Sequence, residues 1–284
     1  MNKRFFALLC VLCGIFPAFS LTAQEIFCAR KIDWEKGEVT LTLSSALAQS
    51  GPNRPAAVIT AERRIDTSLP RIFSEALLPV QIDSLQRFEE AVENGDFPAA
   101  ELLTLSMAGK KNIPRYAQDM QSVSIDYTYR LHDILAAYFV RHKQAMEIPR
   151  FISWIPTTEY TGIVIYADAS LPVHGEDAES SVVPCLFPEI FDEEMNPVFS
   201  LEMGDPAYLK RWGSAAYASS FDEAPWKHRI GERPMRIIAR GLYGKYPTDL
   251  KISPQDAARI LALPENRRLL AEGRVLIISE VMKD

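Results

Sequence analysis

The segment Ser122–Tyr129 alternates strictly between polar and apolar side chains, with Val123, Ile125, Tyr127 and Tyr129 at every second position. Successive side chains of a strand point to opposite faces of a sheet, so this period predicts a strand with one buried and one polar face. A sheet that is solvated on one face is typically antiparallel. The chain must therefore supply helices or a second layer to cover the apolar face.

Three other segments extend the prediction of a sheet-containing fold. Glu38–Leu43 also alternates and predicts a second half-buried strand. Thr161–Ala167 and Val275–Ile278 are instead almost continuously apolar, which is typical of strands covered on both faces. We expect these last two segments to lie in the interior of one sheet.

Helical periodicity accounts for much of the remaining chain. Apolar residues recur at helical spacing over residues 57–77, where Pro70 either kinks one helix or divides it from a second helix capped by Thr67 or Ser68. Ser253, Pro254 and Asp256 favour a helix start, and Pro264 is expected to end that helix. The pattern further predicts helices over 84–94, 98–107 and 131–139, a short strand at Val80–Asp83, and strands at Met235–Leu242 and Thr248–Ile252.

Composition places the chain among globular proteins. The 284 residues are 48% hydrophobic and 24% charged, with 13 Gly, 19 Pro and 4 Cys, which excludes collagen, a disordered chain and a disulfide scaffold. The predicted fold class is α+β, a mixed and mainly antiparallel sheet packed with helices, in one domain or two lobes. A stretch from Pro149 to Pro156 separates an N-terminal α+β region (24–157) from a C-terminal one (158–284).

The N-terminus has the layout of a secretory signal peptide. A basic head, Asn2–Arg4, precedes the apolar run Phe5–Leu21. A cleaved signal peptide is favoured over a retained anchor, because Pro17 interrupts the run. Cleavage after Ser20 or Ala23 would suit small-residue specificity, and Ala23 is the favoured position. The interpretation predicts a 1–23 signal peptide and a periplasmic protein.

Cysteine usage bears on the same compartment. Cys10 and Cys13 lie in the leader, and neither follows a small residue as a lipid-attachment cysteine would. The remaining pair, Cys28 and Cys185, could form a disulfide outside the cytoplasm or could be two small buried hydrophobes. Sequence does not decide between these alternatives.

Net charge argues against a nucleic-acid partner. The formal charge is −6, so the chain lacks the excess of basic residues that is typical of nucleic-acid-binding proteins. One local exception is a basic stretch beside Trp226, which could bind an acidic partner or polymer, although a solvated loop is the simpler interpretation. Its members are Lys227, His228, Arg229 and Arg233.

Motifs of known chemistry are absent from the sequence. No zinc-protease helix, nucleophile elbow, Cys-x-x-Cys pair in the mature chain or dinucleotide fingerprint occurs, and Tyr246 stands where a phosphate loop needs Ser or Thr after Lys245. His132 and His142 are ten residues apart on an expected helix, so their directions differ by about 80°. We assign no catalytic, cofactor-binding or metal-binding residue and expect no cofactor.

Two acidic segments are the strongest candidates for acid–base or metal chemistry. One follows the predicted central strand, where α/β proteins often bind ligands, and contains Asp168, His174, Glu176 and Asp177. A solvated turn is nevertheless the favoured interpretation because the spacing fits no known ligand set. The other segment, Asp192–Glu194, is interpreted as a charged hairpin tip.

Five C-terminal segments together resemble a known family. They are YTGIVIYA (160–167), PCLFPEIFDEEMNPVF (184–199), RIGERPMRIIARGL (229–242), TDLKISPQDAARIL (248–261) and LAEGRVLII (270–278). In this order they resemble the FlgP-like flagellar family, related to small outer-membrane lipoproteins, and especially its exported spirochaete-type members. The helix over 57–77 and the following PVQIDS (79–84) resemble that family's opening. The chain departs from the family in lacking the lipid-attachment cysteine and in having Asn196-Pro197 at a usual glycine turn.

The resemblance implies a non-enzymatic exported protein that supports the flagellar motor and motility as part of a ring or disc. Its implied partners are copies of itself and other motor proteins, with outer-membrane association through those partners. Ser122–Tyr129 would provide a pairing edge, reachable at Ser124 or Asp126, if it lies at the side of its sheet. The alternatives are a periplasmic ligand- or polymer-binding module that uses Trp226, and a hydrolase built around Asp168, His174 and Glu176.

Overall fold

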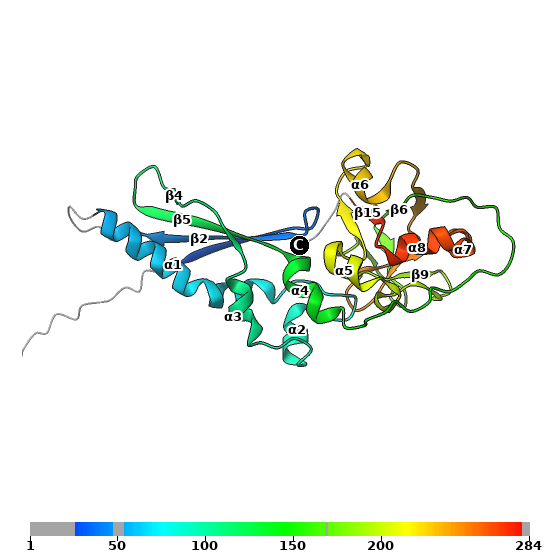
Figure 1. The fold of residues 1–284 in the computed structure, drawn as a ribbon, viewed down its shortest axis with the longest axis horizontal. Helices are drawn as coiled ribbons and strands as arrows, with labels where there is room; N and C mark the ends of the chain where they lie inside the picture. The colour runs from blue at the N-terminus through cyan, green and yellow to red at the C-terminus, as the bar shows by residue number, and fades with distance from the viewer. Residues whose placement is uncertain (1–25, 48–53, 168–169, 280–284) are drawn as a thin grey trace, which may run out of the picture.

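The computed structural model describes residues 26–47, 54–167 and 170–279, and the predicted signal peptide lies outside these ranges. The described chain forms an elongated molecule with two lobes (Figure 1). Long antiparallel strands and α1–α4 make the N-terminal lobe, which ends at Phe139. The C-terminal lobe begins at Ile163 and contains the other sheets and α5–α8. The predicted α+β class, with two lobes, is confirmed.

The N-terminal lobe is a sheet covered on one face by a long helix. Strands β1 (Phe27–Asp33), β2 (Glu38–Ala46) and β5 (Ser122–Arg130) are antiparallel, and β3 (Lys110–Lys111) and β4 (Arg115–Tyr116) pair with β5. Buried and half-buried positions alternate along β2 and β5, as predicted.

A single helix, α1 (Arg54–Leu77), covers the apolar face of this sheet. It continues through Pro70, so of the two predicted outcomes the second helix does not form. The Ser74 hydroxyl donates to the Pro70 carbonyl at 2.8 Å. The Phe73 ring packs against Tyr129 of β5 with 4.5 Å between ring centroids.

The segment after α1 is less regular than predicted. Val80–Asp83 is not a strand, because only one isolated bridge joins Gln81 to Arg87. The Asp83 carboxylate accepts hydrogen bonds from the backbone N–H groups of Leu85 and Gln86, which holds a turn where a helix was expected to begin. Helices α2 (Phe88–Glu93) and α3 (Glu101–Ser106) are therefore shorter than the predicted 84–94 and 98–107.

Helix α4 (Leu131–Phe139) follows β5 directly and ends the lobe. The prediction that His132 and His142 share a helix was wrong, because the helix ends three residues before His142. That imidazole instead bonds the Gly204 carbonyl across the lobe boundary at 2.8 Å. Residues 140–162 then form a connection without helix or strand.

A four-stranded parallel sheet forms the centre of the C-terminal lobe. Its order is β11 (Ala216–Ala218), β15 (Val275–Ile278), β6 (Ile163–Tyr166) and β12 (Met235–Ile238). The two continuously apolar segments are the two inner strands, as predicted. Full burial of β15 fits a strand that is covered on both faces.

A second, mixed sheet lies in the same lobe. Its order is β10 (Pro197–Phe199), β9 (Ile190–Asp192), β14 (Asp249–Ile252) and β13 (Gly241–Tyr243), and β7 (Leu171–Pro172) pairs separately with β8 (Glu179–Ser180). The predicted single strand Met235–Leu242 was wrong: it is divided between the two sheets. The chain leaves the parallel sheet after Ile238 and enters the mixed sheet at Gly241.

The helices of this lobe are α5 (Pro206–Trp212), α6 (Lys227–Ile230), α7 (Pro254–Ala262) and α8 (Pro264–Ala271). The predicted start of α7 is confirmed, because the Ser253 side chain accepts from the Asp256 N–H. Helix α8 was not predicted. Pro264 was interpreted only as a terminator, although proline is equally suited to a first helical turn.

The two lobes share one apolar core that runs continuously between them. Backbone bonds cross the boundary from Leu186 to Gln81 (3.1 Å) and from Phe187 to Ile82 (3.0 Å). Helices α4 and α5 also contact each other across it. None of the helices in the described ranges is long and apolar enough to cross a membrane.

The strand that was expected to pair with other copies of the chain does not lie at a sheet edge. Strand β5 is flanked by β2 on one side and by β3 and β4 on the other, so Ser122–Tyr129 is not an edge. Ser124 bonds Ser44 at 2.7 Å, and Asp126 accepts from Thr42 at 2.8 Å. Among the described strands, β1 is an edge of the N-terminal sheet, β11 and β12 are the edges of the parallel sheet, and β10 and β13 are the edges of the mixed sheet.

Candidate functional site

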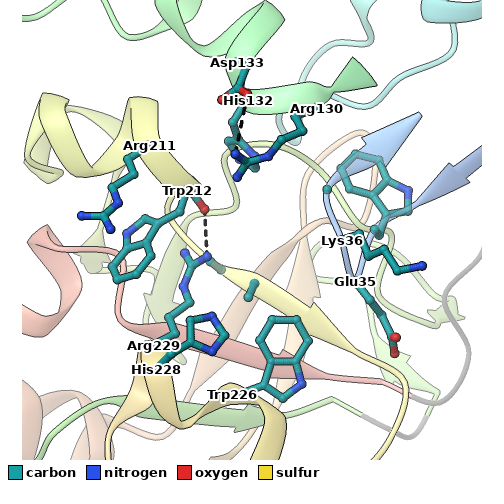
Figure 2. Close-up of a pocket in the computed structure, with 14 residues that line it drawn as sticks. Glu35, Lys36, Arg130, His132, Asp133, Arg211, Trp212, Trp226, His228 and Arg229 are labelled. Carbon is teal, nitrogen blue, oxygen red and sulfur yellow. Dashed lines mark hydrogen bonds and ion pairs between the residues drawn. The ribbon is translucent and has the colours of Figure 1, made fainter. Parts of the chain in front are cut away.

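The most elaborate cavity lies where the two lobes meet (Figure 2). Its volume is about 500 Å³, within the usual range for small-molecule sites. The N-terminal lobe contributes the β1–β2 turn and the junction of β5 with α4. The C-terminal lobe contributes the end of α5, the start of β11 and the turn where the short 3₁₀ helix Ala224–Trp226 meets α6. The lining residues are Trp34, Glu35, Lys36, Gly37, Arg130, His132, Asp133, Arg211, Trp212, Ala215, Ala216, Trp226, His228 and Arg229.

Three tryptophans from separate elements form aromatic walls of this interlobe cavity. Trp34 meets the buried Tyr217 edge to face, with ring centroids 6.0 Å apart. Trp212 ends α5 and donates its indole N–H to the Glu272 carbonyl at 2.8 Å. Trp226 stacks on His228 at 6.2 Å. Each ring is half-buried, so part of its surface stays accessible.

Arg229 is the buried cation of the cavity, and backbone carbonyls of the protein accept its hydrogen bonds. Its guanidinium donates to the carbonyls of Gly273 (2.7 Å), Trp212 (2.8 Å) and Gly213 (2.9 Å). It also lies 5.0 Å from the centroid of the Trp212 ring. Burial lowers the pKa of Arg229 to about 9, which leaves it charged at neutral pH. Its role is to hold the end of α5 and thereby the position of Trp212.

His132 lies at the N-terminal side of the cavity and is neutral. Burial, followed by the positive charge of Arg229, lowers the pKa of His132 to about 4. Its Nε2 is buried without a hydrogen-bond partner. The ring approaches Gly213, whose φ of +77° favours glycine and where an added Cβ would collide with Nε2. The lobes therefore meet closely at this point.

The remaining charged groups form a less buried rim. Arg130 pairs with Asp133 at 3.7 Å, and the Glu35 carboxylate accepts from the Ser219 N–H at 2.7 Å. Arg211 is exposed and lies 5.4 Å from the Trp212 centroid. Four cationic side chains thus line the cavity against two carboxylates, whereas the whole chain has a net charge of −6. The cavity is a locally positive region of an acidic protein.

The structure divides the predicted basic stretch. Trp226, His228 and Arg229 line the cavity, whereas Lys227 and Arg233 do not. Lys227 pairs with Glu232 at 2.7 Å on the surface. The favoured interpretation of a solvated loop was wrong for Arg229, which is 5% exposed. A basic residue in the short helix α6 points inward because three backbone carbonyls converge on it.

Sequence reasoning missed most of the cavity. Trp34, Arg130, Arg211 and Trp212 were not selected, since no local pattern indicates that a turn near residue 35 meets a helix end near residue 212. Tryptophan is rare in this chain, with only 4 copies. Three of these tryptophans line the cavity, so the tryptophans were the one type of residue in the sequence that could have pointed to it.

The predicted acid–base candidates do not gather into a site. Asp168 lies outside the described residues. Glu176 and Asp177 are exposed in the β7–β8 turn, and His174 bonds the Lys251 ammonium at 3.0 Å. No cluster of three or more metal-ligating side chains occurs within residues 26–47, 54–167 and 170–279.

The second acidic segment forms the β9–β10 hairpin turn, as predicted. Glu193 and Glu194 are exposed there, whereas Asp192 accepts hydrogen bonds from the backbone and side-chain amides of Asn196, both at 2.8 Å. The Asp192 carboxylate therefore stabilises the turn through these hydrogen bonds.

Cys28 and Cys185 are both free. Cys28 is half-buried on the edge strand β1. Cys185 is buried in the C-terminal lobe, where its backbone N–H donates to the Tyr217 hydroxyl at 3.0 Å. Of the two alternatives left open by the sequence, the structure has the unbridged pair.

Two family models match the chain, one in each lobe. Residues 25–137 match the model of the N-terminal domain of Treponema pallidum Tp0624, and residues 162–281 match the model of its second domain. No protein of curated function matches significantly. The boundary between the matches falls in the connection after α4, next to the interlobe cavity. The chain thus resembles the first two domains of Treponema pallidum Tp0624, in the same order along the sequence.

Proposed function

We propose that the protein is a non-enzymatic, exported binding module that holds an anionic ligand or a segment of an acidic polymer in the interlobe cavity. The observation that carries the proposal is the convergence of three tryptophans and a cationic excess on one cavity. Indole faces bind planar or pyranose rings by stacking, and the guanidinium groups balance negative charge.

The hydrogen-bond partners and charge states of the lining residues favour binding over catalysis. Arg229 is held by three carbonyls, and Glu35 and Asp133 already have partners. His132 is neutral and faces Gly213 rather than a nucleophile. The accessible groups that remain for a ligand are the indole faces and the Arg211 guanidinium. These groups orient and neutralise a ligand.

The test is a fluorescence titration with an acidic oligosaccharide, such as oligogalacturonate, against its neutral counterpart. We expect quenching of tryptophan emission that saturates with the acidic probe and weakens as salt rises. Trp226→Ala and Arg211→Ala should each weaken binding about tenfold. Arg233→Ala is the matched control, because Arg233 is basic and exposed but lies outside the cavity. Equal binding of the neutral probe, or equal loss in Arg233→Ala, would refute the proposal.

A structural role in the flagellar motor is the second candidate. It rests on the resemblance to FlgP-like proteins, and the open edges of β1 and β12 are where copies could pair. Strand β1 carries Arg30 and Lys31 on this edge, so pairing with another copy would need a complementary segment. Gene deletion followed by a motility assay and imaging of the motor in place tests this role. Normal motility with an unaltered motor would exclude it.

A further inference from the structure

The connection between the lobes carries two strongly exposed apolar side chains, including the most exposed large apolar residue of the described ranges, Ile152. It runs around the far side of the C-terminal lobe as a long green trace (Figure 1). Within it, Ile152 is 98% exposed, Trp154 is 85% exposed and Phe151 is 37% exposed. We refer to residues 151–156 as the loop tip. Neither the fold nor the interlobe cavity uses these side chains.

The loop tip is held in place at both ends. On its N-terminal side, Ile148 is buried and the Phe151 N–H donates to the Leu261 carbonyl at 3.2 Å. On its C-terminal side, the Thr157 hydroxyl donates to the Arg259 carbonyl at 3.1 Å.

Asn266 of α8 strengthens the second attachment. It is 1% exposed, its amide donates to the Thr158 carbonyl at 2.9 Å, and its side-chain oxygen accepts from the Tyr160 N–H at 3.0 Å. The tip therefore projects from α7 and α8 on two fixed stems. Apolar side chains on such a projection are not hidden by collapse of the loop onto the lobe.

The chemistry of the tip fits a lipid surface. No charged residue occurs from Phe151 to Thr158, whereas Arg150 and Glu159 flank this run. Tryptophan is enriched at the boundary between lipid headgroups and acyl chains, where an amphipathic ring is favoured. Attachment to a membrane interface strengthens with the apolar area that is buried in it.

The size of the tip argues against a second copy of the chain or another protein. A stable protein interface uses about 20–30 residues on each side, and the tip offers six contiguous ones on a convex projection. A bilayer needs no matching concave surface. We propose that the loop tip inserts Ile152 and Trp154 into the interface of a lipid bilayer and so holds the C-terminal lobe against a membrane.

Vesicle co-sedimentation tests the proposal, with the form expected after cleavage at Ala23, so that the apolar leader does not contribute. The vesicles contain equal amounts of phosphatidylethanolamine and phosphatidylglycerol. We expect the wild-type protein to co-sediment, and Ile152→Ser/Trp154→Ser to reduce the bound fraction at least fivefold. Because the contact is apolar, a rise in salt should change binding by less than twofold.

The matched control is Ile113→Ser, which removes an 87% exposed isoleucine from the N-terminal lobe. This variant should bind vesicles as the wild type does. Emission of Trp154, taken as the difference between wild type and Trp154→Phe, should shift to the blue and be quenched by brominated lipids. Absence of wild-type binding, equal loss in Ile113→Ser, or an unquenched Trp154 would overturn the proposal. So would self-association that Ile152→Ser/Trp154→Ser abolishes, since a second copy would then be the occupant.

Discussion

Arg229 illustrates, at the scale of the residue, how one buried cation holds the wall of a cavity in place. Its planar guanidinium reaches three carbonyls at 2.7–2.9 Å, which no other side chain can do in the same geometry. Its sequence neighbours Lys227, His228 and Arg233 are exposed. The sequence shows a basic stretch, but only the fold determines which member turns inward.

Replacement of Arg229 should therefore destabilise the protein even when the charge is kept. A lysine can bond fewer carbonyls, and its ammonium is harder to bury, so Arg229→Lys should lower the free energy of unfolding by about 2–4 kcal/mol. Urea denaturation measures the change. Arg233→Lys is the exposed counterpart and should stay within about 0.5 kcal/mol of wild type. Equal stability of the two variants would contradict the structural role of Arg229.

At the scale of the element, the sequence predicts strands and helix starts that depend on local patterns. The alternation in Ser122–Tyr129, the apolar run Val275–Ile278 and the cap at Ser253 are local signals, and each produced the predicted element. Pairing partners are not local. The division of Met235–Leu242 between two sheets and the interior place of β5 depend on segments far along the chain. For the same reason the four missed cavity residues carried no local signal.

The glycine that follows α5 offers a test at this scale. Gly213 has φ of +77° and faces His132, whereas Gly175 has φ of +83° and an added Cβ there would meet no atom within 4 Å. Gly175→Ala should cost about 1 kcal/mol from backbone strain alone. Gly213→Ala adds a collision with a packed ring and should cost about 2–4 kcal/mol more. Thermal or urea unfolding of both variants separates the two effects, and equal losses would show that the His132 contact is unimportant.

At the scale of the whole molecule, the stability of the fold depends on pH through two carboxyl groups buried near the lobe boundary. Burial raises the pKa of Glu189 to about 7 and that of Asp249 to about 6. The Asp249 carboxylate accepts from the Glu189 N–H at 3.0 Å and from the side chain of Ser84, a residue of the N-terminal lobe. These carboxyl groups bind protons more readily in the folded state than in the unfolded state.

This difference sets the sign of a pH effect. The folded state binds more protons between about pH 4 and pH 7, so these two groups lower stability as the pH rises through that window. Glu189→Gln removes one of these titrations. We expect its stability relative to wild type to increase by about 1–2 kcal/mol from pH 5 to pH 8, as measured by urea denaturation at each pH. Glu176→Gln replaces an exposed carboxylate of the β7–β8 turn and is the matched control variant.

The continuous core has a consequence for how a ligand would reach the interlobe cavity. Hinged proteins admit cargo by swinging two halves apart, but here such a swing would wet an apolar seam and break the backbone bonds between residues 81–82 and 186–187. A ligand would instead approach the indole faces that stay accessible while the lobes remain together. In the proposed binding role, the cavity would act as a rigid receptacle, with nearly the same outline whether empty or filled.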